Sequence, residues 1–221
     1  MRRVNSCVKL IGAAMLLLLS RAVRADGPQD QQLEHEPPLG GRSRFYAGFA
    51  AGIGDGRWTV DGKSVSWGDI PGIDSPIAPS IALRVGLTLS PTVLVWTEVL
   101  AVGRYGGAAV GLGGGAASTE RKAAVNHFSL GMTWYPWVRG AFIRGGAGLA
   151  EAFEEYHTAQ LESVPRTFGF GLTGGAGWAF LLVDHVALVL EGDLLKGFYG
   201  EAPGRPSSSL AWATMVGLEW Q

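Results

Sequence analysis

From residue 44 onward, apolar side chains recur at every second position, which is the period of a β-strand with one apolar face. In 45–53, Phe45, Phe49 and Ile53 alternate with small residues, and in 81–89 the branched apolar residues alternate with Arg84 and small side chains. The pattern predicts eight strands, over 45–53, 81–89, 93–105, 124–135, 140–150, 166–182, 186–198 and 208–220. An even number of antiparallel strands can close into a barrel.

The predicted connections alternate in length along the chain. Residues 55–79, 106–123, 151–165 and 199–207 form long connections, whereas 90–92, 136–139 and 183–185 form short turns. Long and short connections therefore fall at opposite ends of the strands. Bacterial outer-membrane barrels have this asymmetry, with short periplasmic turns and longer external loops. Helical spacing from Ala150 to Glu162 additionally predicts a short helix in the third long connection.

The second face of each strand carries mostly Gly, Ala, Ser and Thr, with isolated charges. A soluble sandwich or a lipocalin-like barrel would need a well-charged exterior, which this face does not supply. The apolar face is therefore predicted to meet lipid, and the small face to fill a narrow lumen. An aromatic girdle is predicted near the turn ends of the strands, formed by Phe45, Trp134, Trp137, Phe180 and Trp220.

The N-terminus predicts an exported precursor. Residues 1–25 have a basic start and an apolar core of ten residues, Leu10 to Leu19, too short for a spanning helix of about 20 residues. Residues 26–43 are predicted to be a flexible periplasmic lead-in, and 44–221 the barrel. The single cysteine lies in the predicted signal peptide, so no disulfide is expected. Removing that peptide leaves 13 basic and 19 acidic residues, a balance that argues against nucleic acid as a partner.

The strand pattern, signal peptide and loop alternation together resemble the small OmpA/OmpX-type outer-membrane barrels. The resemblance implies a closed, eight-stranded, antiparallel up-and-down transmembrane β-barrel in the bacterial outer membrane, present as a monomer. Its implied partners are outer-membrane lipid, lipopolysaccharide and the outer-membrane assembly machinery; no cofactor and no metal are expected. Members of this group typically end in an aromatic residue, and here Trp220 is followed by Gln221.

Strand parity points seven charged residues into the predicted lumen: Arg84, Glu98, Arg104, Arg144, Glu191, Asp193 and Glu219. A three-residue turn over Ser90 to Thr92 sets Arg84 opposite Glu98, where the two charges are cross-strand neighbours. The turn over 183–185 likewise sets Glu191 against Gly177 and Asp193 against Gly175. Buried charges need partners, so a structural ion-pair network is favoured over a gate or a proton-linked path.

His127 and Ser129 raise the alternative of an enzyme, because outer-membrane lipid A deacylases use a His and a Ser two residues apart on one strand face. Leu130 stands where the resembling motif has Asn, and Ala141 lies near the expected glutamate position. Both residues also point into the lumen, away from a lipid substrate, so catalysis is not predicted. An acidic tract at Glu151, Glu154, Glu155 and His157 offers cation ligands, but a solvated surface is favoured.

The sequence therefore predicts a non-enzymatic integral outer-membrane protein that displays surface loops for envelope integrity, adhesion or surface interaction. Two alternatives remain open: a narrow conduit for small or hydrophobic molecules, and a lipid A-modifying hydrolase that uses His127 and Ser129. Because one fold serves many functions, the step from barrel to role is an analogy.

Overall fold

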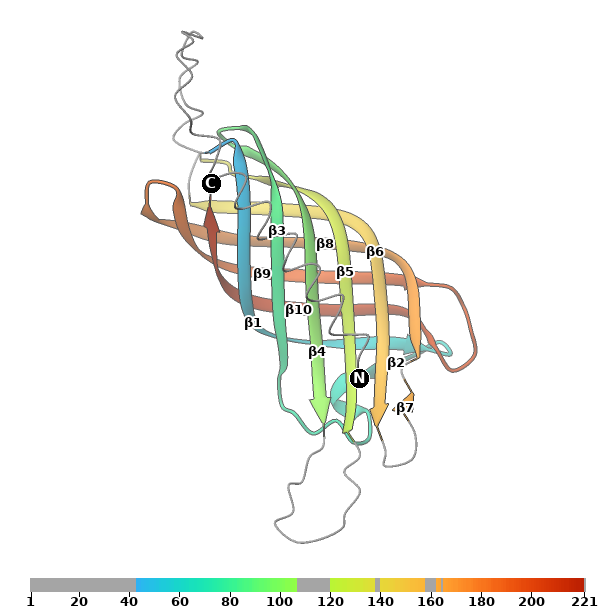
Figure 1. The fold of residues 1–221 in the computed structure, drawn as a ribbon. Helices are drawn as coiled ribbons and strands as arrows, with labels where there is room; N and C mark the ends of the chain where they lie inside the picture. The colour runs from blue at the N-terminus through green and yellow to red at the C-terminus, as the bar shows by residue number, and fades with distance from the viewer. Residues whose placement is uncertain (1–42, 107–119, 138–139, 158–161, 164, 221) are drawn as a thin grey trace, which may run out of the picture. The chain divides into compact units, whose positions relative to one another are not determined.

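The computed structural model describes residues 43–106, 120–137, 140–157, 162–163 and 165–220. Within these residues, eight long strands form one closed antiparallel barrel (Figure 1): β1 (Phe45–Val60), β3 (Ala78–Ser90), β4 (Val93–Gly106), β5 (Glu120–Trp134), β6 (Ala141–His157), β8 (Arg166–Val183), β9 (Val186–Tyr199) and β10 (Pro206–Trp220). Each pairs with the next, and β10 pairs with β1 to close the sheet. The predicted fold class and all eight strands are confirmed. The predicted signal peptide, and the lead-in except Ser43, lie outside the described residues.

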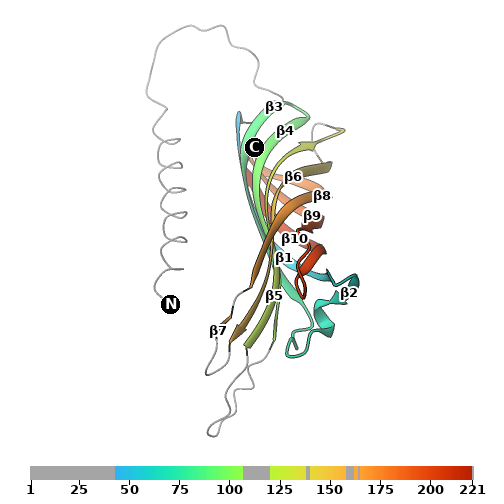
Figure 2. The same cartoon turned by 90° about the vertical axis from the view of Figure 1, so that its right-hand side faces the viewer.

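Three short elements lie at the end of the barrel where the long connections are, which is called the loop end; the opposite end is called the turn end (Figures 1 and 2). β2 (Lys63–Ser66) pairs with the last four residues of β1, and the 3-10 helix η1 (Trp67–Asp69) follows it. β7 (Glu162–Ser163) pairs with β6. Within the described residues, no helix is long and apolar enough to cross a membrane.

The predicted long connection 55–79 contains the end of β1 and the whole of β2, which form a hairpin. Val60 pairs with Lys63 across a two-residue turn, in which Asp61 and Gly62 both have positive φ angles of 47° and 76°. An Asp-Gly turn with this backbone matches the twist of the two strands that it joins. The dipeptide Asp61-Gly62 is the sequence signal that predicts this hairpin.

The predicted helix from Ala150 to Glu162 is wrong, because β6 continues as a strand to His157. The strand continues because β5 pairs with it as far as His157 and β8 pairs with it as far as Phe153. Ion pairs between β5 and β6 reinforce this pairing: Arg121 contacts Glu154, and Nζ of Lys122 lies 4.0 Å from Oε2 of Glu155. Paired backbone groups on both edges outweigh the weak helical spacing of the sequence.

The register of the barrel has a large stagger. A row of paired residues that starts at Gly48 returns to β1 ten positions further along, through Arg84, Glu98, Ser129, Gly148, Gly171, Gly197, Ser209 and Trp58. Eight strands with this stagger tilt by about 40° from the barrel axis. The lumen is then wide enough for side chains only, so most residues of this row are small, and Arg84 and Glu98 form an ion pair.

Two of the turns differ from the prediction at their tips only. Ser90 pairs with Val93, and the ladder is irregular at Leu89, so the turn has two residues and not three. Leu182 interrupts the β8–β9 ladder in the same way. A bulge takes up one extra residue without moving the rest of the strand. The predicted pairing of Arg84 with Glu98 is therefore confirmed.

Burial in this barrel is the reverse of burial in a soluble protein. Leu130, on the outer wall, has 65% of its surface exposed, whereas Arg84 and Glu98 in the lumen have 1% and 2%. Large apolar side chains cover the outer wall on all eight barrel strands. Contiguous exposed apolar surface of this extent marks contact with lipid or with another protein.

Candidate functional site in the barrel lumen

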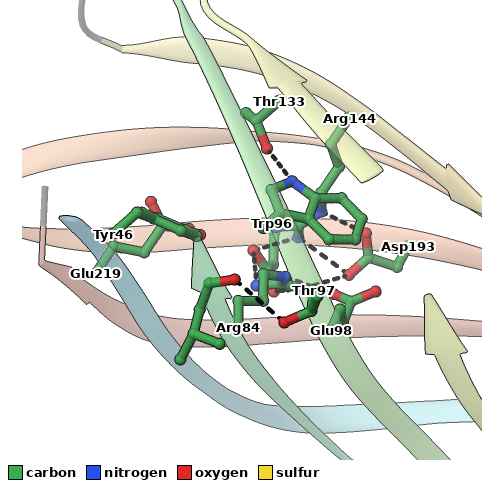
Figure 3. Close-up of polar contacts among 11 residues, drawn as sticks. Tyr46, Arg84, Trp96, Thr97, Glu98, Thr133, Arg144, Asp193 and Glu219 are labelled. Carbon is green, nitrogen blue, oxygen red and sulfur yellow. Dashed lines mark hydrogen bonds and ion pairs between the residues drawn. The ribbon is translucent and has the colours of Figure 1, made fainter. Parts of the chain in front are cut away.

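Charged side chains from four strands meet in the middle of the lumen (Figure 3). Arg84 on β3 binds Glu98 on β4 through its Nε atom. Its Nη2 atom lies 2.9 Å from Oε1 of Glu191 and 3.5 Å from Oδ2 of Asp193, both on β9. The Arg84 guanidinium is therefore surrounded by three carboxylates.

Arg144 on β6 completes this central ion cluster. Its Nε donates to Oδ1 of Asp193 at 2.9 Å, and its Nη2 donates to Oδ2 at 3.1 Å, which makes a bidentate pair. Nη2 also contacts Glu191. The cluster thus contains two guanidinium groups and three carboxylates, all buried. Low dielectric strengthens each contact and makes each one costly to break.

Glycines create the space that these long side chains occupy. Asp193 pairs with Gly175 and Glu191 with Gly177, so both predicted pairings are confirmed. A Cβ atom at Gly175 would lie 1.9 Å from Oδ1 of Asp193. A Cβ atom at Gly177 would lie 2.5 Å from Cζ of Phe142. The Phe142 ring in turn contacts Arg144, with 5.2 Å between its centroid and the guanidinium carbon.

The structure places two of the seven predicted lumen charges away from the central ion cluster. Glu219 lies nearer the turn end, where Tyr46 donates to its Oε1 atom at 2.6 Å and Tyr135 to its Oε2 atom at 3.3 Å. Arg104 lies near the loop end and pairs with Asp55, with 3.2 Å between Nη1 and Oδ2. The two tyrosines were not among the predicted lumen residues, although strand parity points Tyr46 inward.

Apolar side chains pack in the lumen on both sides of the central ion cluster. Toward the turn end lie Tyr46, Leu94, Trp96, Tyr135 and Phe142, and the indole of Trp96 donates to Oγ1 of Thr133 at 2.8 Å. Toward the loop end lies a larger group, named here the loop-end plug, which includes Trp58, Trp67, Ile70, Ile73, Leu100, Val102, Leu195 and Met215. Trp67, Ile70 and Ile73 come from the first long connection, and sequence periodicity did not assign them to the core.

His127 and Ser129 point into the lumen and are buried. Neither ring nitrogen of His127, nor Oγ of Ser129, has a hydrogen-bond partner within the described part of the chain. The His127 ring packs against Gly171, where a Cβ atom would lie 2.9 Å from Nδ1. Nucleophilic catalysis by serine needs a base within hydrogen-bond reach and a third group that orients the base. The described residues do not assemble that set.

The acidic tract on β6 is engaged in pairs. Glu151 accepts from Asn126 at 2.9 Å and from Arg166 at 2.8 Å, and Glu154 contacts Arg121. Among the described residues, no group of three His, Cys, Asp or Glu side chains is placed to hold a metal ion. The side chain of His157 lies outside the described part.

The five residues named for the aromatic girdle all expose their rings on the outer wall at the turn end. Trp137 has the largest exposed fraction, 69%. The structure adds a second group near the loop end, formed by Tyr105, Phe168 and Phe198, which the sequence analysis did not name. Aromatic residues at two levels of the outer wall are typical of the two interfaces of a bilayer.

Comparison with solved structures identifies similar folds. The attachment invasion locus protein of Yersinia pestis, solved in complex with the heparin analogue sucrose octasulfate, aligns with a TM-score of 0.52 and 9% identity, over 80% of this chain and 100% of that one. This chain has the fold of the small outer-membrane β-barrels. Neisserial surface protein A aligns with a TM-score of 0.47 and 10% identity, over 80% of this chain and 97% of that one.

The predicted resemblance to OmpA/OmpX-type barrels is thereby confirmed for the fold. No protein-family model matches the chain, and no curated protein matches it. The function of this outer-membrane-type barrel must therefore be argued from its own residues.

Proposed function

We propose that this protein is a monomeric, non-enzymatic integral protein of the bacterial outer membrane, which displays its long connections at the cell surface for adhesion or surface contact. The observation that carries the proposal is the reversed distribution of side chains, with ion pairs inside and large apolar residues outside. Exposed apolar surface costs about 25 cal/mol per Å² in water, and large apolar side chains on all eight barrel strands favour lipid as the surrounding medium. Closure of β10 onto β1 leaves no unpaired strand edge in the hydrocarbon.

The packed lumen supports a role in displaying surface loops and argues against a role as a conduit for small molecules. The central ion cluster lies between two groups of packed apolar side chains, and Trp67 inserts from the first long connection into the loop-end plug. Eight strands leave no space for an aqueous channel once such side chains fill the lumen. We therefore expect the purified protein to show no stable conductance steps in a planar bilayer.

The β1–β2 hairpin is the described element best suited to display. The rings of Trp58 and Trp67 pack edge to face with their centroids 5.9 Å apart, so the hairpin base is held to the barrel mouth. Its turn contacts the last long connection, because the backbone N–H of Gly204 donates to Oδ1 of Asp61 at 3.2 Å. A rigid scaffold that carries solvated loops is a common arrangement for binding. The name of the Yersinia protein, an attachment protein, agrees with this role.

Epitope tags test location, orientation and display together. A Cβ atom at Gly62 would have no other heavy atom within 4 Å, so a tag inserted in this turn should not disturb the barrel. An antibody should label this tag on intact cells, whereas a matched tag between Asp184 and His185, in a turn at the opposite end, should be labelled only after the outer membrane is permeabilised. Recovery of the untagged protein as a soluble periplasmic species would overturn the proposal. Deleting 61–62 should weaken the binding of whole cells to surfaces or glycans. Unchanged binding would contradict the role in display but not the location in the outer membrane.

A further inference from the structure

The outer wall contains a groove of about 320 Å³ near the loop end, across β1, β3, β4, β5 and β6. Four small residues line the groove and form its floor: Ala51, Ala101, Gly103 and Ala124. Gly103 pairs with Ala124, which pairs with Phe153, so floor and side wall are neighbours on adjacent strands. Ile81 and Tyr105 line the groove as well. Its lining is mainly apolar, which suits a hydrocarbon chain.

Lys122 lies at the rim of this groove, between two aromatic rings. Its Nζ atom is 4.8 Å from the ring centroid of Tyr105 and 5.2 Å from that of Phe153. The nearest carboxylate oxygen, on Glu155, is 4.0 Å away, which is an ion pair but too long for a hydrogen bond. An ammonium group has three N–H donors, and within the described residues its neighbours are these two rings and the Glu155 carboxylate, with no acceptor at hydrogen-bond distance.

The neighbouring cation is engaged differently. Arg166 lies against the same Phe153 ring, with 5.7 Å between its guanidinium carbon and the centroid, and it donates to Glu151 at 2.8 Å. Arg166 therefore has a hydrogen-bonded carboxylate, whereas Lys122 retains donors for a further acceptor. Lys122 and Glu155 are partly exposed, and solvent-screened ion pairs contribute only about 0–1 kcal/mol, so an anion with better geometry can displace the carboxylate.

We propose that this groove binds one acyl chain of a phosphate-bearing lipid, and that Lys122 contacts the lipid phosphate. The inference rests on the proposed function, because it needs the outer wall to be in a bilayer with the loop end outward. In that orientation the ligand is the phosphorylated, multiply acylated lipid A part of lipopolysaccharide. The chain fills the floor over Gly103 and Ala124, and the phosphate lies at the aromatic interface, where Lys side chains reach the headgroup region.

Charge favours a lipid over a second copy of the protein as the occupant. In a two-fold symmetric pair centred on the groove, Lys122 would face the Lys122 of the other copy. Two ammonium groups would then approach each other in a poorly hydrated contact, which costs free energy. A phosphate instead offers oxygen atoms that can accept hydrogen bonds from the ammonium group.

The test measures binding of purified bisphosphoryl lipid A, and of the same lipid after enzymatic removal of its phosphates, to the full mature chain in detergent micelles by native mass spectrometry. The wild type should bind the phosphorylated form roughly tenfold more tightly, a free-energy difference of about 1.4 kcal/mol. Lys122→Gln should abolish this preference, because the amide keeps the size and loses the charge. Ala124→Leu, which fills the floor, should weaken both lipids by about tenfold.

Matched controls lie elsewhere on the outer wall. Lys196→Gln removes another lysine that lies near a ring, 5.4 Å from the centroid of Phe198, and Ala147→Leu enlarges an outer-wall alanine between Leu130 and Leu172. Neither control should change either affinity. Equal binding of both lipids to the wild type, or an equal loss in Lys196→Gln, would overturn the phosphate contact. A change of oligomeric state in Ala124→Leu, with lipid binding unchanged, would show that a second copy is the occupant.

Failure of the inference is distinguishable from failure of the proposed function. Each variant is also checked for migration on gels without heating and for recovery with outer membranes. If the groove assignment is wrong, all variants remain folded and membrane-embedded with unchanged lipid binding. If the proposed function is wrong, the wild type itself does not fractionate with the outer membrane.

Discussion

Removal of Arg84 is the perturbation that tests the central ion cluster most directly. Arg84 has 1% of its surface exposed and contacts three carboxylates. Two of these, on Glu191 and Asp193, keep Arg144 as a partner when Arg84 is lost. Glu98 does not, because within the described residues it forms its ion pair with Arg84 alone. Arg84→Leu therefore leaves one carboxylate without a partner in the lumen.

The magnitudes follow from this asymmetry. Breaking a buried pair by removing one member costs about 3–5 kcal/mol, so Arg84→Leu should lower the free energy of unfolding by that amount. Glu98→Leu should cost only about 1–3 kcal/mol, because Arg84 retains two carboxylates. The double variant removes both charges and leaves no orphan, so it should cost less than the sum of the two single variants. The expected interaction free energy is about 2–3 kcal/mol.

Guanidinium unfolding in detergent micelles, followed by tryptophan fluorescence, gives the three free energies needed. A matched cycle pairs Glu98→Leu with Arg144→Leu, which removes the other guanidinium of the cluster without a direct contact to Glu98. Its interaction free energy should be clearly smaller. If Arg84 and Glu98 are additive within about 0.5 kcal/mol, or if both cycles give the same value, the assigned pairing does not exist in the folded barrel.

Three further outcomes are expected. Gly175→Val should lower stability by about 1–3 kcal/mol by overpacking against Asp193, whereas Gly174→Val, where a Cβ atom has no neighbour closer than 3.9 Å, should change the denaturation midpoint little. Trp67→Ala should cost about 3–5 kcal/mol in thermal or chemical unfolding, because the residue is fully buried in the loop-end plug, and Trp137→Ala, on the outer wall, should cost far less; equal losses would contradict the plug. Protease added to intact cells should cleave within 55–79 or 106–123 and spare 136–139, as read by mass spectrometry of the fragments; cleavage confined to 136–139 would mean that the barrel is inverted.

Strand order and register were predictable because they depend on local rules. Alternation fixes which side chains point inward, and a short turn fixes the pairing of the strands it joins, so Arg84 and Glu98 could be placed together without a structure. The turns are one residue shorter than predicted, but bulges at Leu89 and Leu182 keep the predicted pairing in the rest of each strand. The composition of the central ion cluster could not be predicted in this way, because the cluster joins β3 and β6 to β9 across the lumen and no turn specifies those contacts.

The parts that the sequence did not predict depend on contacts between distant segments. Trp67 belongs to a connection without any period, and only the shape of the barrel mouth selects it for burial. Arg104 lies outside the central ion cluster because it is six positions nearer the loop end of β4 than Glu98, within reach of Asp55 on β1. The helix predicted from Ala150 failed because its apolar spacing is compatible with a strand once β5 and β8 supply hydrogen bonds on both sides.

The contact of β10 with β1 has a consequence for the order of events during biogenesis. The hydrogen bond from Tyr46 to Glu219 joins residues 173 positions apart, so the first strand cannot complete its ladder until the last one has arrived. Until then both strands carry a row of unpaired amides, and each unsatisfied group in hydrocarbon costs several kcal/mol. A half-inserted sheet is therefore far less stable in lipid than either the closed barrel or the chain in water. For a protein that inserts as proposed, insertion is then nearly concerted, or a partner covers the open edges until the last hairpin has paired.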